Sequence, residues 1–163
     1  MNGETLSVLI VDDHSVVRMG MAALLSAETD LHVVGNAKNG IEAISLARTL
    51  QPDVIVMDVE MPRKDGIETT AEIMAEQPDA KILILTSFST TDRIAQAIKS
   101  GALGAIMKNA DDSEMVAAIR AVGPGKVYLA KDIKRLFKED PPMPELSPRQ
   151  REILRGNARF STP

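Results

Sequence analysis

Residues 53–62 have the sequence DVIVMDVEMP, and this stretch decides the fold predicted for the chain. Four apolar residues, Val54 to Met57, end abruptly at the carboxylate of Asp58, and Pro62 follows soon after. A run this short between turn-forming residues predicts a strand rather than a helix. Because the whole run is apolar, both faces of the strand should be covered, as in a parallel sheet. Asp58 would then lie at the carboxyl end of a buried strand, where open α/β sheets bind ligands.

The composition is that of a globular protein with an aliphatic core. Hydrophobic residues make up 44% of the 163 residues and charged residues 26%, but aromatic residues only 2%. The chain has no cysteine, which excludes disulfide bonds and thiolate metal sites. No apolar run reaches the length of a membrane span, and residues 1–4 lack the basic flank of a signal peptide. We therefore expect a cytoplasmic protein with no membrane partner.

The net charge of −4 is unevenly distributed along the chain. Residues 1–130 hold 11 basic and 18 acidic side chains, whereas residues 131–163 hold 8 basic and 5 acidic ones. Such an asymmetry can indicate a C-terminal part that faces nucleic acid, although surface solvation explains most charge runs.

Short strand-like runs and amphipathic segments alternate along the first 122 residues. The predicted strands lie at 7–11, 32–35, 54–57, 81–85 and 105–107. Between them, apolar residues recur at helical spacing. This alternation predicts an α/β fold: a doubly wound, five-stranded parallel sheet with helices on both faces. We expect 1–122 to form one domain, 123–145 to be a linker containing a helix, and 146–163 to be a short helical tail.

Polar side chains stand at the ends of four predicted strands. They are Asp12 and Asp13, Asp58, Thr86 and Lys108. The carboxyl ends of parallel strands lie along one edge of a sheet, so these side chains should converge. Three carboxylates in one place need a cation, and an all-oxygen site suits Mg²⁺. With Lys108 as a positive charge and Thr86 as a hydroxyl donor, the set can position and neutralise a phosphoryl group transferred to the carboxylate of Asp58.

Each of these residues also has a plainer interpretation. A single carboxylate after a strand is most often a cap or a turn residue, and the combination is what favours chemistry. His14 follows the acid pair, but a site for a hard cation does not need imidazole, so we favour a helix-start role for it.

Five segments of the sequence form a joint pattern: Val11-Asp12-Asp13-His14, Met57-Asp58-Val59-Glu60-Met61-Pro62, Asp65-Gly66-Ile67, Leu85-Thr86 and Met107-Lys108. Together they resemble the signatures of the response-regulator receiver domain, the CheY-like group with a flavodoxin-like fold. The resemblance covers residues 7 to about 122. It implies a sensor histidine kinase as the partner that donates a phosphoryl group to Asp58.

The resemblance also assigns roles around Asp58. It implies that Asp13 binds Mg²⁺ directly, that Asp12 binds it largely through water, and that the backbone carbonyl of Glu60 is a third protein ligand. Asp58 is itself part of this metal set.

Switching is the second property that the resemblance implies. Lys108 would pair with the phosphoryl group, and Thr86 would move towards it. The family usually places an aromatic residue three positions before this lysine, but here that position is Ala105, which is too small for aromatic-coupled switching.

Two C-terminal segments, Gly125-Lys126-Val127-Tyr128-Leu129 and residues 146–154, carry a second resemblance. They resemble the linker and opening helix of the NarL/FixJ type, whose receiver is followed by a LuxR-like helix-turn-helix. After Arg155 the sequence departs from the family pattern, so we expect 146–163 to be a remnant of the output domain without a recognition helix. DNA would then be bound only through a complete output domain. Exposed apolar residues in the first and fifth predicted helices also make a homodimer plausible.

The sequence supports one main function and leaves two alternatives open. The main hypothesis is a two-component response regulator whose phosphorylation regulates an output, namely transcription in full-length relatives. It is a phosphate acceptor that loses its own phosphoryl group, and so not an enzyme in the ordinary sense. One alternative is a DNA-binding transcription regulator with a purely structural receiver. The other is an aspartyl-phosphate phosphatase, because Glu60 stands two residues after the nucleophile.

Overall fold

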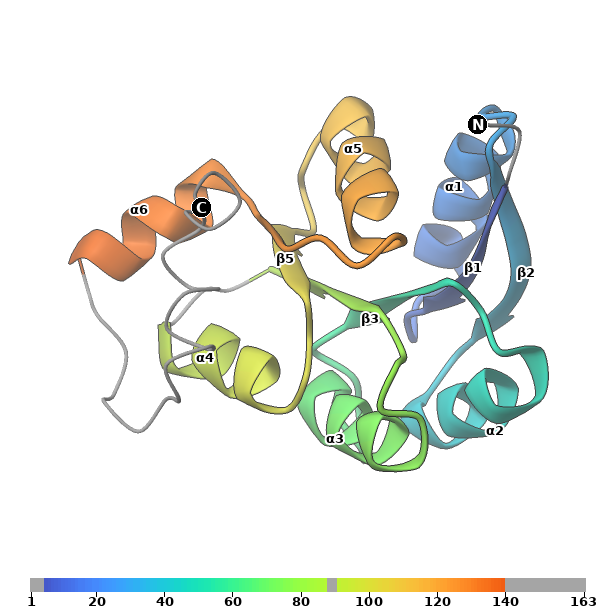
Figure 1. Ribbon diagram of the computed structural model, residues 1–163, viewed down its shortest axis with the longest axis horizontal. Coiled ribbons are helices and arrows are strands. Elements are labelled where there is room, and N and C mark those ends of the chain that lie inside the picture. The colour runs from blue at the N-terminus through green and yellow to red at the C-terminus, as the bar shows by residue number, and fades with distance from the viewer. Residues whose placement is uncertain (1–4, 88–90, 140–163) are drawn as a thin grey trace.

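The computed structural model describes residues 5–87 and 91–139 as a parallel sheet covered by helices on both faces (Figure 1). In Figure 1, α1 and α5 lie on one face of the sheet and α2, α3 and α4 on the other. The elements in chain order are β1 Leu6–Val11, α1 Ser15–Ser26, β2 Leu31–Ala37, α2 Gly40–Leu50, β3 Val54–Asp58, α3 Gly66–Glu76, β4 Ile82–Thr86, α4 Thr91–Lys99, β5 Gly104–Met107, α5 Asp112–Val122, β6 Tyr128–Leu129 and α6 Lys131–Glu139.

The strand order confirms the predicted doubly wound fold. The strands lie in the order β2-β1-β3-β4-β5-β6, and every neighbouring pair is parallel. From β1 the chain moves outward to β2, then returns to place β3 on the other side of β1. The direction of winding therefore reverses between β1 and β3, and ligands of such sheets bind at this point, beyond the carboxyl ends of the strands.

The sheet has one strand more than the five predicted. Strand β6, Tyr128–Leu129, pairs in parallel with Gly104 and Ala105 of β5, and α6 follows it directly. Two residues are too few to give a periodic apolar pattern, which is why the sequence did not predict this strand. Helix α6 lies within the segment predicted as a linker, and it buries Ile133 and Phe137. The predicted tail, 146–163, lies outside the described residues.

The core is aliphatic, as its composition predicted. Strands β3 and β4 are buried at every position, and the four last residues of β1 are buried as well. Among the described residues, the exposed large apolar side chains are Val16 and Met19 on α1 and Ile41 on α2. Within residues 5–87 and 91–139, no helix is both long and apolar enough to cross a bilayer.

One premise of the predicted homodimer is wrong. The fifth helix was expected to expose apolar residues, but Met115, Ile119 and Val122 of α5 are buried. They face the sheet, because a helix on a doubly wound sheet turns its apolar stripe inward. Only α1 retains the exposed apolar residues on which that expectation rested.

Candidate phosphoryl-acceptor site

The predicted site residues lie at one edge of the sheet, around the point where the winding reverses. Asp12 and Asp13 directly follow β1, Asp58 is the last residue of β3, Thr86 is the last residue of β4, and Lys108 directly follows β5. The side chain of Lys108 reaches across β4 to the acids. Its Nζ lies 3.1 Å from Asp12 Oδ2 and 3.2 Å from Asp58 Oδ2. The ammonium group of Lys108 thus bridges two carboxylates that stand at the ends of different strands.

Asp12 is fixed in place by the first turn of α1. Its side chain is fully buried, and Oδ1 accepts a hydrogen bond of 2.8 Å from the backbone N–H of His14. Arg18, one turn into α1, donates from Nη1 to the backbone carbonyl of Asp12 at 2.7 Å. The polar end of β1 is therefore ordered by the helix that follows it.

Asp58 is a buried carboxylate with a raised pKa. Asp58 is 0% exposed, and its Oδ1 accepts a hydrogen bond of 3.1 Å from the backbone N–H of Glu60. Burial, and then the negative charge of Asp12, raise the pKa of Asp58 from 3.8 to about 6, although Lys108 and the Glu60 amide act in the opposite direction. The ionised form is costly in this place and still predominates at neutral pH, which suits a nucleophile.

Lys108 stays protonated despite partial burial. Burial by itself lowers the pKa of Lys108, but its contacts with Asp12 and Asp58 outweigh this effect, and the pKa is raised. A permanent positive charge beside Asp58 is what a phosphoryl group needs from a lysine.

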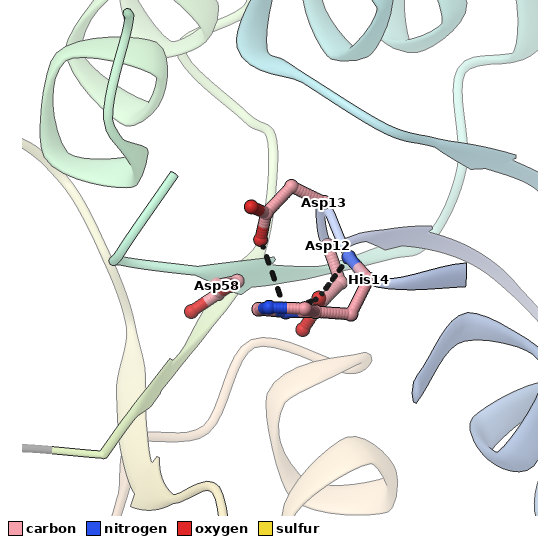
Figure 2. Close-up of side chains that lie close together, drawn as sticks. All are labelled: Asp12, Asp13, His14 and Asp58. Carbon is pink, nitrogen blue, oxygen red and sulfur yellow. Dashed lines mark hydrogen bonds and ion pairs between the residues drawn. The ribbon is translucent and has the colours of Figure 1, made fainter. Parts of the chain in front are cut away.

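The acidic cluster fits a divalent cation. Asp12, Asp13, His14 and Asp58 each offer a ligand atom, and these atoms all lie within 4.8 Å of one another (Figure 2). Two of the oxygens, Asp12 Oδ2 and Asp13 Oδ1, are buried without a hydrogen-bond partner among the described residues. The 3.1 Å approach of Lys108 to Asp12 Oδ2 is an ion-pair distance without hydrogen-bond geometry. Buried unsatisfied carboxylate oxygens are unusual, and a hard cation would satisfy them.

His14 lies closer to the cluster than the sequence suggested. It occupies the N-cap position of α1 without a side-chain capping bond, and its Nδ1 lies 3.2 Å from both Asp12 Oδ1 and Asp13 Oδ1. Figure 2 shows the imidazole lying against the two acids. The backbone of His14 has the predicted helix-start role, and its imidazole also contacts Asp12 and Asp13.

The loop between β3 and α3 is held against the backbone of Asp58. Asp65 caps α3 by accepting from the Glu68 N–H, while the Glu68 side chain accepts from the Asp65 N–H, a complete capping box. Next to it, a Cβ on Gly66 would lie 2.2 Å from the carbonyl oxygen of Asp58. Only glycine permits this close approach, which explains why Asp-Gly stands at this point of the sequence.

Thr86 donates a hydrogen bond to the side chain of Glu60, a residue that the sequence implicated as a backbone metal ligand and, in the phosphatase alternative, as a second acid. Thr86 Oγ1 donates to Glu60 Oε2 at 3.2 Å, and Ser87 donates to Glu60 Oε1 from its hydroxyl at 2.8 Å and from its N–H at 3.3 Å. Sequence reasoning missed this contact, because residues 26 positions apart show no pattern that would reveal it. The predicted role of the Glu60 carbonyl as a metal ligand stays a prediction.

Fold and site together are those of a signal-receiver domain, in which an acidic cluster surrounds a buried aspartate at the reversal point of a doubly wound sheet. Residues 8–120 match the family described as the response regulator receiver domain. The chain therefore belongs to the response-regulator receiver family.

Similar curated proteins are response regulators from several bacteria. The chain is 44% identical to the transcriptional regulatory protein LiaR of Bacillus subtilis over 128 residues, which cover 78% of this chain and 61% of LiaR. It is 36% identical to the response regulator GacA of Pseudomonas aeruginosa over 156 residues, which cover 91% of this chain and 73% of GacA. The match to the oxygen regulatory protein NreC of Staphylococcus carnosus, at 38% identity, covers 76% of this chain and 58% of NreC. The chain thus spans less than two thirds of the length of LiaR and of NreC.

Solved structures give the same assignment. A LuxR-family two-component response regulator from Aurantimonas superposes with a TM-score of 0.80 at 34% identity, over 83% of this chain and 97% of the other. The receiver domain of the putative response regulator NarL from Mycobacterium tuberculosis superposes with a TM-score of 0.72 at 29% identity, over 76% of this chain and 99% of the other. These neighbours confirm both the receiver fold and the predicted NarL/LuxR affiliation.

Proposed function

We propose that Asp58 accepts a phosphoryl group from the phosphohistidine of a sensor histidine kinase, and that this chain is the receiver part of a cytoplasmic response regulator. The observation that carries the proposal is the bridging of two buried carboxylates, Asp12 and Asp58, by Lys108 at the carboxyl edge of the sheet. Membership of the receiver family supports the kinase as the donor, since receivers of response regulators pair with histidine kinases.

The transfer exchanges one bond to phosphorus for another. A carboxylate oxygen of Asp58 attacks phosphorus, the P–N bond to the donor imidazole breaks, and the electron pair remains on the ring nitrogen, which takes up a proton from solvent. Because the pKa of Asp58 is about 6, the carboxylate is mostly ionised at neutral pH. Lys108 is placed to hold an oxygen of the phosphoryl group, since its Nζ lies 3.2 Å from Asp58 Oδ2.

Asp12, Asp13 and Asp58 are the residues that would hold Mg²⁺, and the unsatisfied oxygens of Asp12 and Asp13 support this assignment. A cation held there would supply positive charge to offset the crowded carboxylates and the incoming phosphoryl oxygens. Two backbone hydrogen bonds orient the carboxylates: the His14 N–H donates to Asp12, and the Glu60 N–H donates to Asp58.

The output is proposed to be transcriptional. LiaR is described as a transcriptional regulatory protein, and residues 146–154 resemble the start of a LuxR-like domain. In this proposal, phosphorylated Asp58 draws Thr86 towards the phosphoryl group, and the new arrangement of the β4–α4 region regulates DNA binding by an output domain. In this proposal, the receiver accepts one phosphoryl group on Asp58 and releases it by hydrolysis of its own aspartyl phosphate. It is not proposed to turn over external phosphoesters, since the Glu60 carboxylate that a phosphatase would use is bonded to Thr86 and Ser87.

Intact-mass spectrometry tests the proposal. The chain is incubated with Mg²⁺ and acetyl phosphate, and a mass increase of one phosphoryl group is expected for the parent chain and none for Asp58→Asn. The matched control is Asp79→Asn, which neutralises an exposed carboxylate between α3 and β4 and should be phosphorylated normally. No adduct on the folded parent chain, or an equal adduct on Asp58→Asn, would refute the assignment.

A further inference from the structure

The side chain of Glu60 holds the end of β4 in one arrangement. From the described residues, its two carboxylate oxygens accept three hydrogen bonds, one from the hydroxyl of Thr86 at 3.2 Å and two from Ser87 at 2.8 and 3.3 Å. Glu60 also donates its backbone N–H to Asp58 at 3.1 Å. One residue thus contacts the phosphoacceptor through its main chain and the neighbouring strand end through its side chain.

The backbone of Glu60 has little freedom to move. Its neighbours Val59 and Met61 are both buried, at 3% and 7% exposure. The Val59 N–H donates to the Leu85 carbonyl at 3.0 Å, and the Gly66 N–H donates to the Val59 carbonyl at 2.9 Å. The backbone of Glu60 therefore holds its carboxylate in a defined position beside Thr86. This favours a stable hydrogen bond between the two side chains.

A hydroxyl has one proton to donate. Thr86 can give that proton to Glu60 or to an oxygen of a phosphoryl group on Asp58, but not to both at once. The Glu60 carboxylate also carries a negative charge, so it becomes a less favourable neighbour once the phosphoryl group adds further negative charge to the site.

We infer that Glu60 is a positioning residue that competes with the phosphoryl group for the Thr86 hydroxyl and so stabilises the unphosphorylated arrangement. This inference rests on the proposed function, since it concerns the switch that phosphorylation of Asp58 would operate. The competition makes activation harder: a phosphoryl group must replace an existing charge-assisted hydrogen bond before Thr86 can turn to it. Glu60 then sets how far the equilibrium between the two arrangements shifts for a given occupancy of Asp58.

The test compares the parent chain with Glu60→Gln, Ser87→Ala and the charge control Asp79→Asn. NMR follows the amide and methyl signals of Thr86 without any phosphoryl donor, and then during titration with beryllofluoride, which mimics the phosphoryl group, in the presence of Mg²⁺. In Glu60→Gln the Thr86 signals should move towards their beryllofluoride-bound positions even before titration. The concentration at half-saturation should fall by up to about tenfold, the size expected when a hydrogen bond to a charged acceptor becomes one to a neutral amide oxygen. Ser87→Ala, which leaves the Thr86 bond in place, should shift this concentration less.

The outcomes separate this inference from the proposed function. If Glu60→Gln matches the parent chain and Asp79→Asn in Thr86 signals and in half-saturation, the inference is overturned, whatever the mass spectra show. If the parent chain takes up no phosphoryl group but the Thr86 signals of Glu60→Gln are displaced in the free protein, the proposed function fails while the contact is upheld. A change in unfolding midpoint with unchanged Thr86 signals would mark a merely structural role and would also overturn the inference.

Discussion

Replacing Asp58 with asparagine should stabilise the folded chain in the absence of metal. The pKa of Asp58 lies at about 6 rather than 3.8, chiefly because the group is buried and faces Asp12. At 1.36 kcal/mol for each pKa unit, this rise means that ionised Asp58 costs about 3 kcal/mol of stability above pH 7. Asparagine has the same shape and carries no charge, so Asp58→Asn should recover most of that amount.

The sign of the pH dependence follows from the direction of the shift. Because folded Asp58 binds its proton more tightly than the unfolded chain does, its protonated form contributes stability that is fully present below about pH 4 and is lost as pH rises through about 6. The advantage of Asp58→Asn should therefore be largest at pH 7.5 and nearly gone at pH 4.

Urea unfolding in EDTA at pH 7.5, 6 and 4 measures this difference as a shift of the midpoint at unchanged slope. The exposed-charge control Asp79→Asn should remain within about 0.5 kcal/mol of the parent chain at each pH. The reasoning would be refuted if Asp58→Asn were no more stable than the parent chain at pH 7.5, or if its advantage were the same at all three values. Added Mg²⁺ should narrow the gap at pH 7.5, since the cation stabilises only a site with its full set of carboxylates.

Three further predictions concern the metal, the lysine and the turn. Asp13→Asn should weaken Mg²⁺ binding by about tenfold or more in a calorimetric titration, and Asp79→Asn should leave it unchanged. Lys108→Met removes the cation beside Asp58, so phosphorylation by acetyl phosphate should slow by at least about tenfold in time-resolved mass spectra, and an unaltered rate would contradict the role given to the lysine. Gly66→Ala should destabilise by about 2–4 kcal/mol in urea, because the new Cβ meets backbone at 2.2 Å. Its control, Gly20→Ala in α1, meets nothing within 4 Å and should stabilise by about 0.5–1 kcal/mol.

The central strands and the edge that carries the site were predictable because their signals are local and strong. A strand buried on both faces must be apolar throughout, as β3 and β4 are, and each ends at a polar residue that the topology brings to the same edge. Once the alternation of strands and helices predicts a parallel sheet, the proximity of Asp12, Asp58 and Lys108 follows without any knowledge of side-chain contacts.

The features that escaped prediction depend on tertiary contacts. A helix-start role was predicted for His14, and it does occupy the cap position of α1, but the contacts of its backbone N–H and imidazole with Asp12 could not be predicted from sequence spacing. The expectation that α5 exposes apolar residues failed because spacing defines an apolar stripe but does not show that the sheet covers all of it. The sequence singled out the Glu60 side chain only as the second acid of a phosphatase and gave no sign of its bond to Thr86, because a carboxylate after a strand looks the same whether it faces solvent or accepts from Thr86.

Strand β6 changes how one edge of the sheet is exposed to other chains. Without residues 123–139, β5 would be the last strand of the sheet, and its four residues, Gly104–Met107, would present unpaired backbone groups along an uncharged edge. Strand β6 is only two residues long and leads directly into α6, which packs Ile133 and Phe137 over the same margin. An edge strand that short offers little template for strand addition, so the segment after α5 limits edge-to-edge pairing on this side of the sheet.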